Sequence, residues 1–317
     1  MKKNLFFAFM FLLGGMLLTA CSNPDNPGGG GQSGPSDLET YFFSVVDATY
    51  EPGAFPEATI PETIEGLYLN EHAIAGGMGQ IEVTTTKTYT KFFIGAEGAP
   101  GYFQFIPTPV GEGGEGGGGL TGNDIYKIAL MYSTLLTDNI VVLIAAEDEN
   151  GDITTAIRIT IIFEWTHVTT DGDINVNLFF SNEKDVDLYL VMPDGTTIYY
   201  GNRGGTYVNE EGETVAWGLD LDSNPGCNID GIKNENIFIP AVLVQNGEYT
   251  VKVDMYSNCD PSIATDWYIQ ARYQGELVTN VIDNELYAGK NPVSGTYPVG
   301  APNRDMTPVL KFIVTGA

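Results

Sequence analysis

The stretch D185-V-D-L-Y-L-V191 indicates the fold class, because apolar and polar side chains alternate along it. Its core-type side chains fall on one face of an extended chain: Val186, Leu188 and Leu190. Asp185 and Asp187 fall on the opposite face, together with Tyr189. Side chains of a β-strand alternate with a period of two, so the stretch predicts a strand with one face in a core and two carboxylates on the other. Pro193-Asp194-Gly195 then predicts a turn, and residues 196–202 predict the partner strand.

The same alternation extends over most of the chain. Stretches rich in Val, Ile, Thr, Tyr and Phe are separated by Gly, Asn and Asp, and almost none has a helical period. Residues 247–260 form another such strand, and residues 149–152 (ENGD) predict a hairpin turn. We therefore predict an all-β protein with two tandem β-sandwiches. The first, over residues 38–165, is expected to be Ig-like, and the second covers residues 166–317.

The beginning of the chain predicts export. Two lysines and an apolar run lead to Leu18-Thr19-Ala20-Cys21, an order typical of a signal peptide. Its end resembles the lipobox of bacterial lipoproteins, which implies that residues 1–20 are removed and that Cys21 carries a lipid anchor. Ser22 favours the outer membrane by resemblance to envelope sorting rules, and residues 21–37 predict a flexible tether. The alternative is a secreted protein in which Cys21 is free.

The net charge indicates which kinds of partner the protein can bind, and the cysteines predict a disulfide. The chain has 14 Lys and Arg against 41 Asp and Glu, a formal net charge of −27. Such acidity disfavours nucleic acid and makes cations the natural small partners. In an oxidising compartment Cys227 and Cys259 predict one disulfide, which would stabilise the fold by about 3.5 kcal/mol in the chain-entropy model. A metal-binding pair or a catalytic thiol is less favoured, because no histidine is near in sequence.

The acidic stretch L219-D-L-D-S-N-P-G-C-N-I-D-G-I-K-N-E-N-I237 predicts a cation site. Counted from Asp220 as the first position, oxygen-bearing side chains recur at odd positions, as in Asp220-x-Asp222-x-Asn224. Ca²⁺ accepts six to eight oxygens in irregular geometry, whereas Mg²⁺ requires a near-ideal octahedron. The stretch is not an EF-hand, because Pro225 takes the place of the glycine and Gly231 that of the last glutamate. The predicted Ca²⁺ ligands are Asp187, Asp220, Asp222, Asp230 and Glu235. The alternative is a solvated loop whose Asp and Asn side chains satisfy turn backbone groups.

The order of motifs over residues 173–274 resembles a known family. DVDLYL, PDG, YYGN, LDLD, ENI and GEYTVKVDMYSNC follow one another as in the YfaP-like DUF2135 group of exported bacterial β-sandwich domains. They are also similar to the wider set of prepeptidase C-terminal (PPC-like) sandwiches that accompany secreted enzymes. The resemblance implies that the second domain, residues 166–317, is a β-sandwich of jelly-roll/PPC-like type, and the wider set implies calcium binding. Residues 204–218 depart from the pattern as an insertion.

The sequence favours a protein without catalytic activity. Its only histidines, His72 and His167, lie in no catalytic motif. The glycine-rich run Gly111–Leu120 lacks the Gly-Lys-Ser/Thr of a phosphate-binding loop, so it predicts a flexible loop.

We expect a lipid-anchored outer-membrane protein, facing the periplasm or the cell surface. Its Ca²⁺-stabilised sandwich would act in adhesion, in binding an envelope or extracellular protein or glycan, or in envelope assembly. The alternative is a carbohydrate-binding or accessory module of a glycan- or peptide-processing system. Aromatic side chains that could stack on sugars are Tyr199, Tyr200, Tyr207, Trp217, Tyr256, Trp267 and Tyr268.

Overall fold

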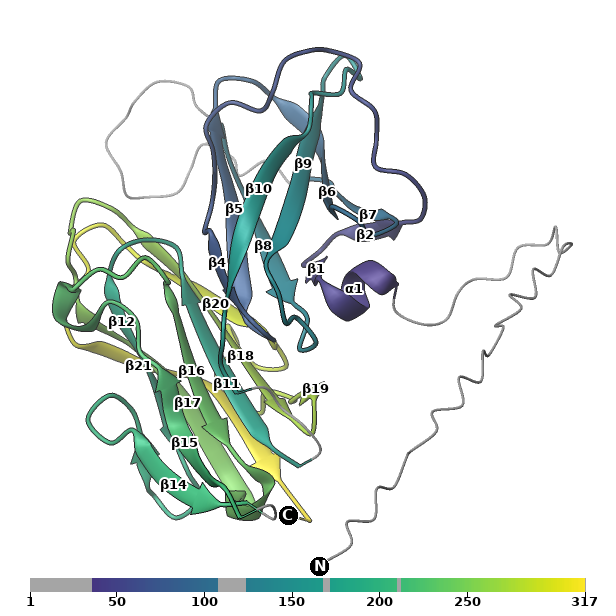
Figure 1. Cartoon of the computed structure of the whole chain (residues 1–317). Coiled ribbons are helices and arrows are strands. Elements are labelled where there is room, and N and C mark those ends of the chain that lie inside the picture. Colours follow the sequence, from purple (N-terminus) through teal and green to yellow (C-terminus); the bar gives the residue numbers. More distant parts are fainter. Residues whose placement is uncertain (1–35, 108–123, 168–171, 210–211, 317) are drawn as a thin grey trace, which may run out of the picture. The chain divides into compact units, whose positions relative to one another are not determined.

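The computed structural model describes residues 36–107, 124–167, 172–209 and 212–316 (Figure 1). The predicted signal peptide, Cys21, the tether up to residue 35 and the glycine-rich run lie outside the described residues. The span Pro35–Ala317 forms one compact unit. Its first element is helix α1 (Asp37–Tyr41), which begins at the N-cap Ser36. The Ser36 hydroxyl accepts a hydrogen bond from Glu39 N, and the Glu39 carboxylate accepts one from Ser36 N, so both free donors are satisfied.

Two sheets enclose the first core (Figure 1). A four-stranded antiparallel sheet has the order β1 (Phe43–Val45), β8 (Asp124–Tyr132), β5 (Met78–Thr85) and β3 (Leu67–Leu69). A six-stranded sheet has the order β2 (Thr49–Glu51), β7 (Tyr102–Phe105), β6 (Tyr89–Ala96), β9 (Ile140–Asp148), β10 (Ile157–Glu164) and β4 (His72–Ile74). β4 pairs with β10 in parallel, and the other pairs of this sheet are antiparallel. The predicted hairpin is present, because β9 and β10 pair on either side of Gly151.

Two further sheets enclose the second core. The seven-stranded sheet has the order β14 (Gly204–Val208), β15 (Thr214–Leu221), β16 (Asn234–Ile239), β11 (Ile174–Phe180), β18 (Thr265–Tyr273) and β19 (Glu276–Leu277), with β20 (Val293–Tyr297) also paired to β18. The four-stranded sheet has the order β13 (Thr197–Ile198), β12 (Asp185–Val191), β17 (Gly247–Ser257) and β21 (Asp305–Val314). Two single 3₁₀ turns lie between strands: η1 (Pro225–Cys227) and η2 (Ala241–Leu243).

The predicted alternation is what builds these cores. On β12 the buried core residues are Val186, Leu188 and Leu190, and on β17 they are Tyr249, Val251, Val253 and Met255. The two cores share no residue: one draws on residues 38–161 and the other on residues 174–314. The all-β, sandwich-type fold is therefore confirmed, whereas the division into two tandem domains, the boundary at 166 and the Ig-like and jelly-roll assignments stay predictions. No helix in the described part of the chain is long and apolar enough to cross a membrane.

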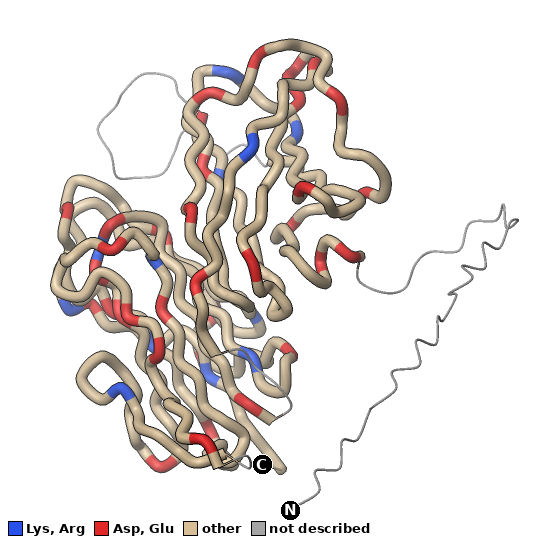
Figure 2. Tube along the Cα trace, viewed as in Figure 1, with Lys and Arg blue, Asp and Glu red and all other residues tan. Residues whose placement is uncertain are grey.

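Polar contacts join the two sandwiches. Asp266 on β18 accepts hydrogen bonds from Gln80 on β5 (3.2 Å) and from Lys127 on β8 (2.5 Å). Lys233, which precedes β16, donates to the hydroxyl of Tyr68 on β3 at 2.6 Å. Acidic residues are spread along the chain in both sandwiches and outnumber the Lys and Arg residues (Figure 2). The contact between the sandwiches therefore uses two lysines of this acidic chain, Lys127 and Lys233.

Candidate metal centre

Three carboxylates from separate segments converge at the margin of the second sandwich. Asp187 lies on β12, Asp222 directly follows β15, and Glu235 lies on β16. Each offers one oxygen, and these oxygens lie within 4.8 Å of one another. Because β12 and β16 belong to different sheets, this carboxylate cluster joins the two layers of the sandwich. The cluster consists of carboxylates alone, without His or Cys.

Glu235 points into the sandwich because of strand alternation. Ile237 and Ile239, on the same face of β16, are core residues, and Glu235 itself is 1% exposed. Its Oε2 accepts a hydrogen bond from Leu188 N at 2.7 Å. β12 pairs with β13 only at Leu190 and Val191, so Glu235 provides the acceptor that Leu188 N does not find in that strand. Its Oε1 is buried and has no protein partner. A buried carboxylate oxygen without a partner is costly unless a cation or a proton is bound to it.

Asp187 carries a second such oxygen. It lies opposite Asp254 of β17 in the strand register, and it is 3% exposed. Its Oδ2 is buried without a protein partner, as is Oδ1 of Asp254. The sequence predicted a strand face that presents carboxylates, but the structure buries both Asp185 and Asp187. Burial disfavours the charged form of a carboxyl group, so it raises the pKa of a buried Asp much more than that of a solvated one.

Burial and crowding shift the pKa values of these groups upward. Burial raises the pKa of Asp187 to about 8, with a further contribution from Asp185, Asp222 and Asp254. The pKa of Glu235 lies well above its usual range, first because of burial and next because of Asp187. Burial also raises the pKa of Asp185 to about 6, although the Gly226 N–H opposes this shift. A divalent cation would reverse this situation, since it stabilises the charged forms that burial disfavours.

A β-bulge aims Asp222 at the cluster. The pairing of β15 with β16 runs through Leu219 and Ile237, then passes over Asp220 and resumes at Leu221 and Asn236. The extra residue shifts the alternation by one, so Asp222 comes to the side of Glu235. Asp222 also forms an ion pair with Arg203, with 2.7 Å between Nη1 and Oδ2. Its side chain is 11% exposed, so it is the most accessible of the three carboxylates.

Asp220, the bulged residue, lies in another network. Its Oδ2 accepts a hydrogen bond from His167 N and lies 2.9 Å from His167 Nδ1, while its Oδ1 accepts one from Asn236 at 2.6 Å. The His167 ring also stacks on Phe238, with 4.7 Å between the ring centroids. Asp220 therefore holds the segment before β11 against the seven-stranded sheet, and it is not grouped with the other carboxylates.

Asp230 closes the loop on itself. Its carboxylate accepts hydrogen bonds from Ser223 Oγ (2.8 Å), Asn224 N (3.0 Å) and Ile232 N (2.9 Å), and its own N–H donates to Asn224 Oδ1 (2.9 Å). This is the role that the solvated-loop alternative expected of the Asp and Asn side chains. The structure thus groups Asp187, Asp222 and Glu235 of the five predicted ligands and places Asp220 and Asp230 elsewhere.

Two acidic residues beside the cluster were not among the predicted ligands. Asp185 accepts a hydrogen bond from Gly226 N at 2.8 Å, and Asp254 lies 4.0 Å from Arg304. The sequence contains a pattern that could have identified each of them. Asp185 lies on the same polar face as Asp187, and Asp254 lies on the alternating polar face of its own strand. The missing information was the register of β12 against β17.

The predicted disulfide is confirmed. Cys227 and Cys259 are bonded, with 5.6 Å between their Cα atoms. The bond joins the end of η1 to the residues that follow β17. It therefore attaches the acidic loop to the sheet that carries Asp187.

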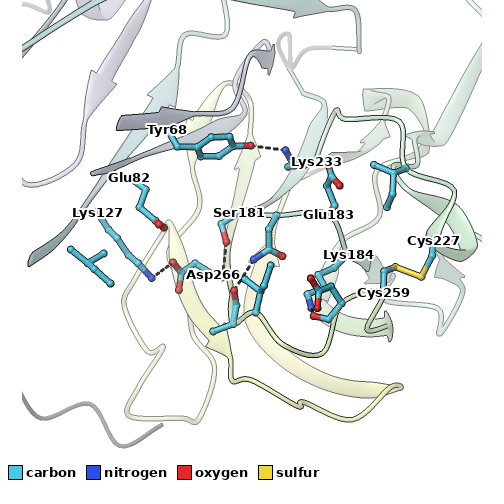
Figure 3. Close-up of a pocket in the computed structure, with 16 residues that line it drawn as sticks. Tyr68, Glu82, Lys127, Ser181, Glu183, Lys184, Cys227, Lys233, Cys259 and Asp266 are labelled. Carbon is cyan, nitrogen blue, oxygen red and sulfur yellow. Dashed lines mark hydrogen bonds and ion pairs between the residues drawn. A yellow bond between two sulfur atoms is a disulfide. The ribbon is translucent and has the colours of Figure 1, made fainter. Parts of the chain in front are cut away.

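A cavity of about 670 Å³ lies beside this disulfide (Figure 3). Both cysteines line it, together with Tyr68, Lys127, Lys184 and Lys233. Lys184 and Lys233 are buried; Lys184 donates to Asn258 Oδ1 (2.5 Å) and to Asp260 O, and Lys233 donates to Tyr68. The cavity wall thus contains the disulfide and two lysines that are held by neutral oxygen acceptors.

The aromatic residues proposed for sugar stacking have diverse positions. Trp267 is 3% exposed and belongs to the second core. Tyr199, Tyr200 and Tyr256 are half-buried and pack on one another and on Tyr189. The Arg304 guanidinium lies 3.4 Å from the centroid of the Tyr256 ring. One face of the Tyr199 ring is therefore covered by Tyr189, and one face of the Tyr256 ring by Arg304.

A scan against models of protein families found no model that matches this chain, and a search of curated proteins found no match. The likeness of residues 173–274 to the YfaP-like group stays a prediction.

Proposed function

We propose that this chain is a non-catalytic, lipid-anchored envelope protein whose second sandwich binds Ca²⁺ at Asp187, Asp222 and Glu235. The observation that carries the proposal is the pair of buried, partnerless oxygens, Oδ2 of Asp187 and Oε1 of Glu235, in one carboxylate cluster. The all-oxygen donor set suits a hard cation and not Zn²⁺, which prefers His and Cys. Ligands from three separate segments suit the irregular coordination of Ca²⁺ better than the strict octahedron of Mg²⁺.

The bound ion would have a structural role. Two of its three carboxylates are 3% and 1% exposed, which leaves little room for a substrate to reach the ion. The ion would hold β12, β16 and the acidic loop together, and so would stabilise the sandwich as a rigid module. A module of this kind suits adhesion, ligand binding or envelope assembly.

Thermal unfolding of the full chain with Ca²⁺ and without it tests the site. A site present only in the folded state should add about 2.7 kcal/mol of stability when free Ca²⁺ is a hundred times Kd. We expect this gain in the wild type and its loss in Asp187→Asn. Asp220→Asn is the matched control, because Asp220 lies in the same acidic stretch but outside the cluster. A wild type that does not respond to Ca²⁺, or a response that survives in Asp187→Asn, would contradict the proposal.

The lipid anchor rests on Leu18-Thr19-Ala20-Cys21 and has its own test. Cells that express the chain are grown with radiolabelled palmitate, and the protein is recovered from the membrane fraction. Label is expected in the wild type and in the control Cys227→Ser, and it is expected to be lost in Cys21→Ser. Equal labelling of Cys21→Ser and the wild type would exclude the anchor.

A further inference from the structure

We propose that the Cys227–Cys259 disulfide sets the affinity of the Ca²⁺ site, so that reduction of this bond weakens Ca²⁺ binding. The inference rests on the proposed function, because it concerns the same carboxylate cluster. It follows from how the acidic loop is attached to the strands that carry the other ligands.

The first attachment runs from the loop to the beginning of β12. Gly226, the residue before Cys227, donates its N–H to Asp185 Oδ2 at 2.8 Å. Asn224 Nδ2 donates to the carbonyl oxygen of Lys184 at 2.9 Å. These contacts hold the loop two and three residues from Asp187, so a displacement of the loop moves Asp222 relative to Asp187.

The second attachment is the disulfide itself. Cys259 follows β17, which pairs with β12 and carries Asp254 opposite Asp187. Asp230, in contrast, bonds only within the loop, to Ser223, Asn224 and Ile232. In the described part of the chain, the disulfide is thus the one covalent cross-link between side chains of the loop and of the segment that follows β17.

The backbone of the loop needs such a link. Asn224, Gly226 and Cys227 have φ angles of 58°, 61° and 63°, in the left-handed region. Cysteine rarely adopts this conformation, because its Cβ crowds the backbone there. Once the bond to Cys259 is broken, Cys227 is free to return to a right-handed or extended conformation, and this change alters the position of Gly226 against Asp185.

The bond is accessible to a reductant. Both cysteines are half-buried and line the cavity beside Lys184 and Lys233 (Figure 3). A dithiol reduces the bond in two steps: one thiolate attacks a cysteine sulfur and releases the other as a thiolate, and the second thiol then displaces the protein. Two electrons and two protons pass to Cys227 and Cys259, which become thiols, and the dithiol becomes a disulfide.

Calorimetric titration with Ca²⁺ tests the proposal on the oxidised full chain and on Cys227→Ser/Cys259→Ser. We expect the double variant to bind about tenfold more weakly, within the range usual for coupled sites. Equal dissociation constants would overturn this proposal and leave the proposed function intact. No binding by the oxidised chain would overturn both.

A second measurement uses only the wild type, in case the double variant does not fold. Coupling between two sites is reciprocal, so Ca²⁺ must oppose reduction by the same factor by which the bond strengthens Ca²⁺ binding. The fraction of reduced chain is measured at equilibrium with graded dithiothreitol, with Ca²⁺ and with chelator. An equilibrium constant for reduction that Ca²⁺ leaves unchanged would overturn the proposal.

Discussion

At the scale of single residues, Glu235 serves two neighbours with its two oxygens. Oε2 accepts from Leu188 N, and Oε1 faces the cluster without a protein partner. The first role needs only an acceptor, whereas the second needs a negative charge. Substitutions that keep one property and remove the other therefore separate the two roles.

Glu235→Gln and Glu235→Leu form such a pair. Gln keeps an oxygen for Leu188 N but removes the charge, so the Ca²⁺-free chain should be at least as stable as the wild type. Leu also removes the acceptor and leaves Leu188 N unpaired, which should lower the free energy of unfolding by about 1–3 kcal/mol. Urea denaturation in the presence of a chelator measures both. If Gln lowers the free energy of unfolding as much as Leu does, the charge of Glu235 does not destabilise the Ca²⁺-free chain, contrary to our inference.

At the scale of elements, the hairpin of β14 and β15 places both Asp222 and its partner Arg203. Gly204 and Gly218 face each other across this hairpin, with φ angles of 102° and 106°. A Cβ on Gly218 would lie 2.0 Å from the carbonyl oxygen of Arg203. Only glycine fits this close approach of two backbones.

Gly218→Ala should therefore destabilise the chain and weaken Ca²⁺ binding together. The backbone must move near Arg203, and strain of this kind costs about 1–3 kcal/mol. Gly205→Ala is the matched control on the same hairpin, since its Cβ would meet only the Trp217 side chain, at 3.3 Å. Denaturation and Ca²⁺ titration of both variants provide the comparison. Equal effects of the two substitutions would show that the close approach at Gly218 is unimportant.

At the scale of the whole molecule, the cluster couples stability to pH. In the Ca²⁺-free folded state the pKa values of Asp185 and Asp187 are about 6 and about 8, above the value of 3.8 for an ordinary Asp. The folded chain therefore holds protons that the unfolded chain has already released in this range. Stability from these groups is present at low pH and is lost as the pH rises through the folded-state pKa values.

The Ca²⁺-free chain should thus lose stability between pH 5 and 8, while the gain from Ca²⁺ should increase over the same range. The ion requires charged carboxylates, so it competes with protons at low pH. Melting temperatures at a series of pH values, with Ca²⁺ and after its removal by dialysis, measure both trends. Asp187→Asn should flatten them. A Ca²⁺-free chain that becomes more stable toward pH 8 would contradict the pKa shifts inferred for the cluster.

The all-β class, the core faces of β12 and β17 and the disulfide could all be predicted from the amino-acid sequence. The strands depend on local information, namely a period of two and turn residues, and the disulfide depends on two cysteines in a chain that is predicted to be exported. A strand exposes the same alternation whichever strand it pairs with, so these features could be predicted before any pairing was known.

Which acidic residues lie close together could not be predicted, because it depends on how distant segments pack. Asp220 and Asp222 look equivalent in the sequence, but the bulge between Leu219 and Leu221 directs Asp220 to His167 and Asp222 to Glu235. Asp187 and Glu235 come together because two different sheets approach at that margin. Bulges and sheet packing arise from contacts between distant segments, so the spacing of residues along the chain does not predict them.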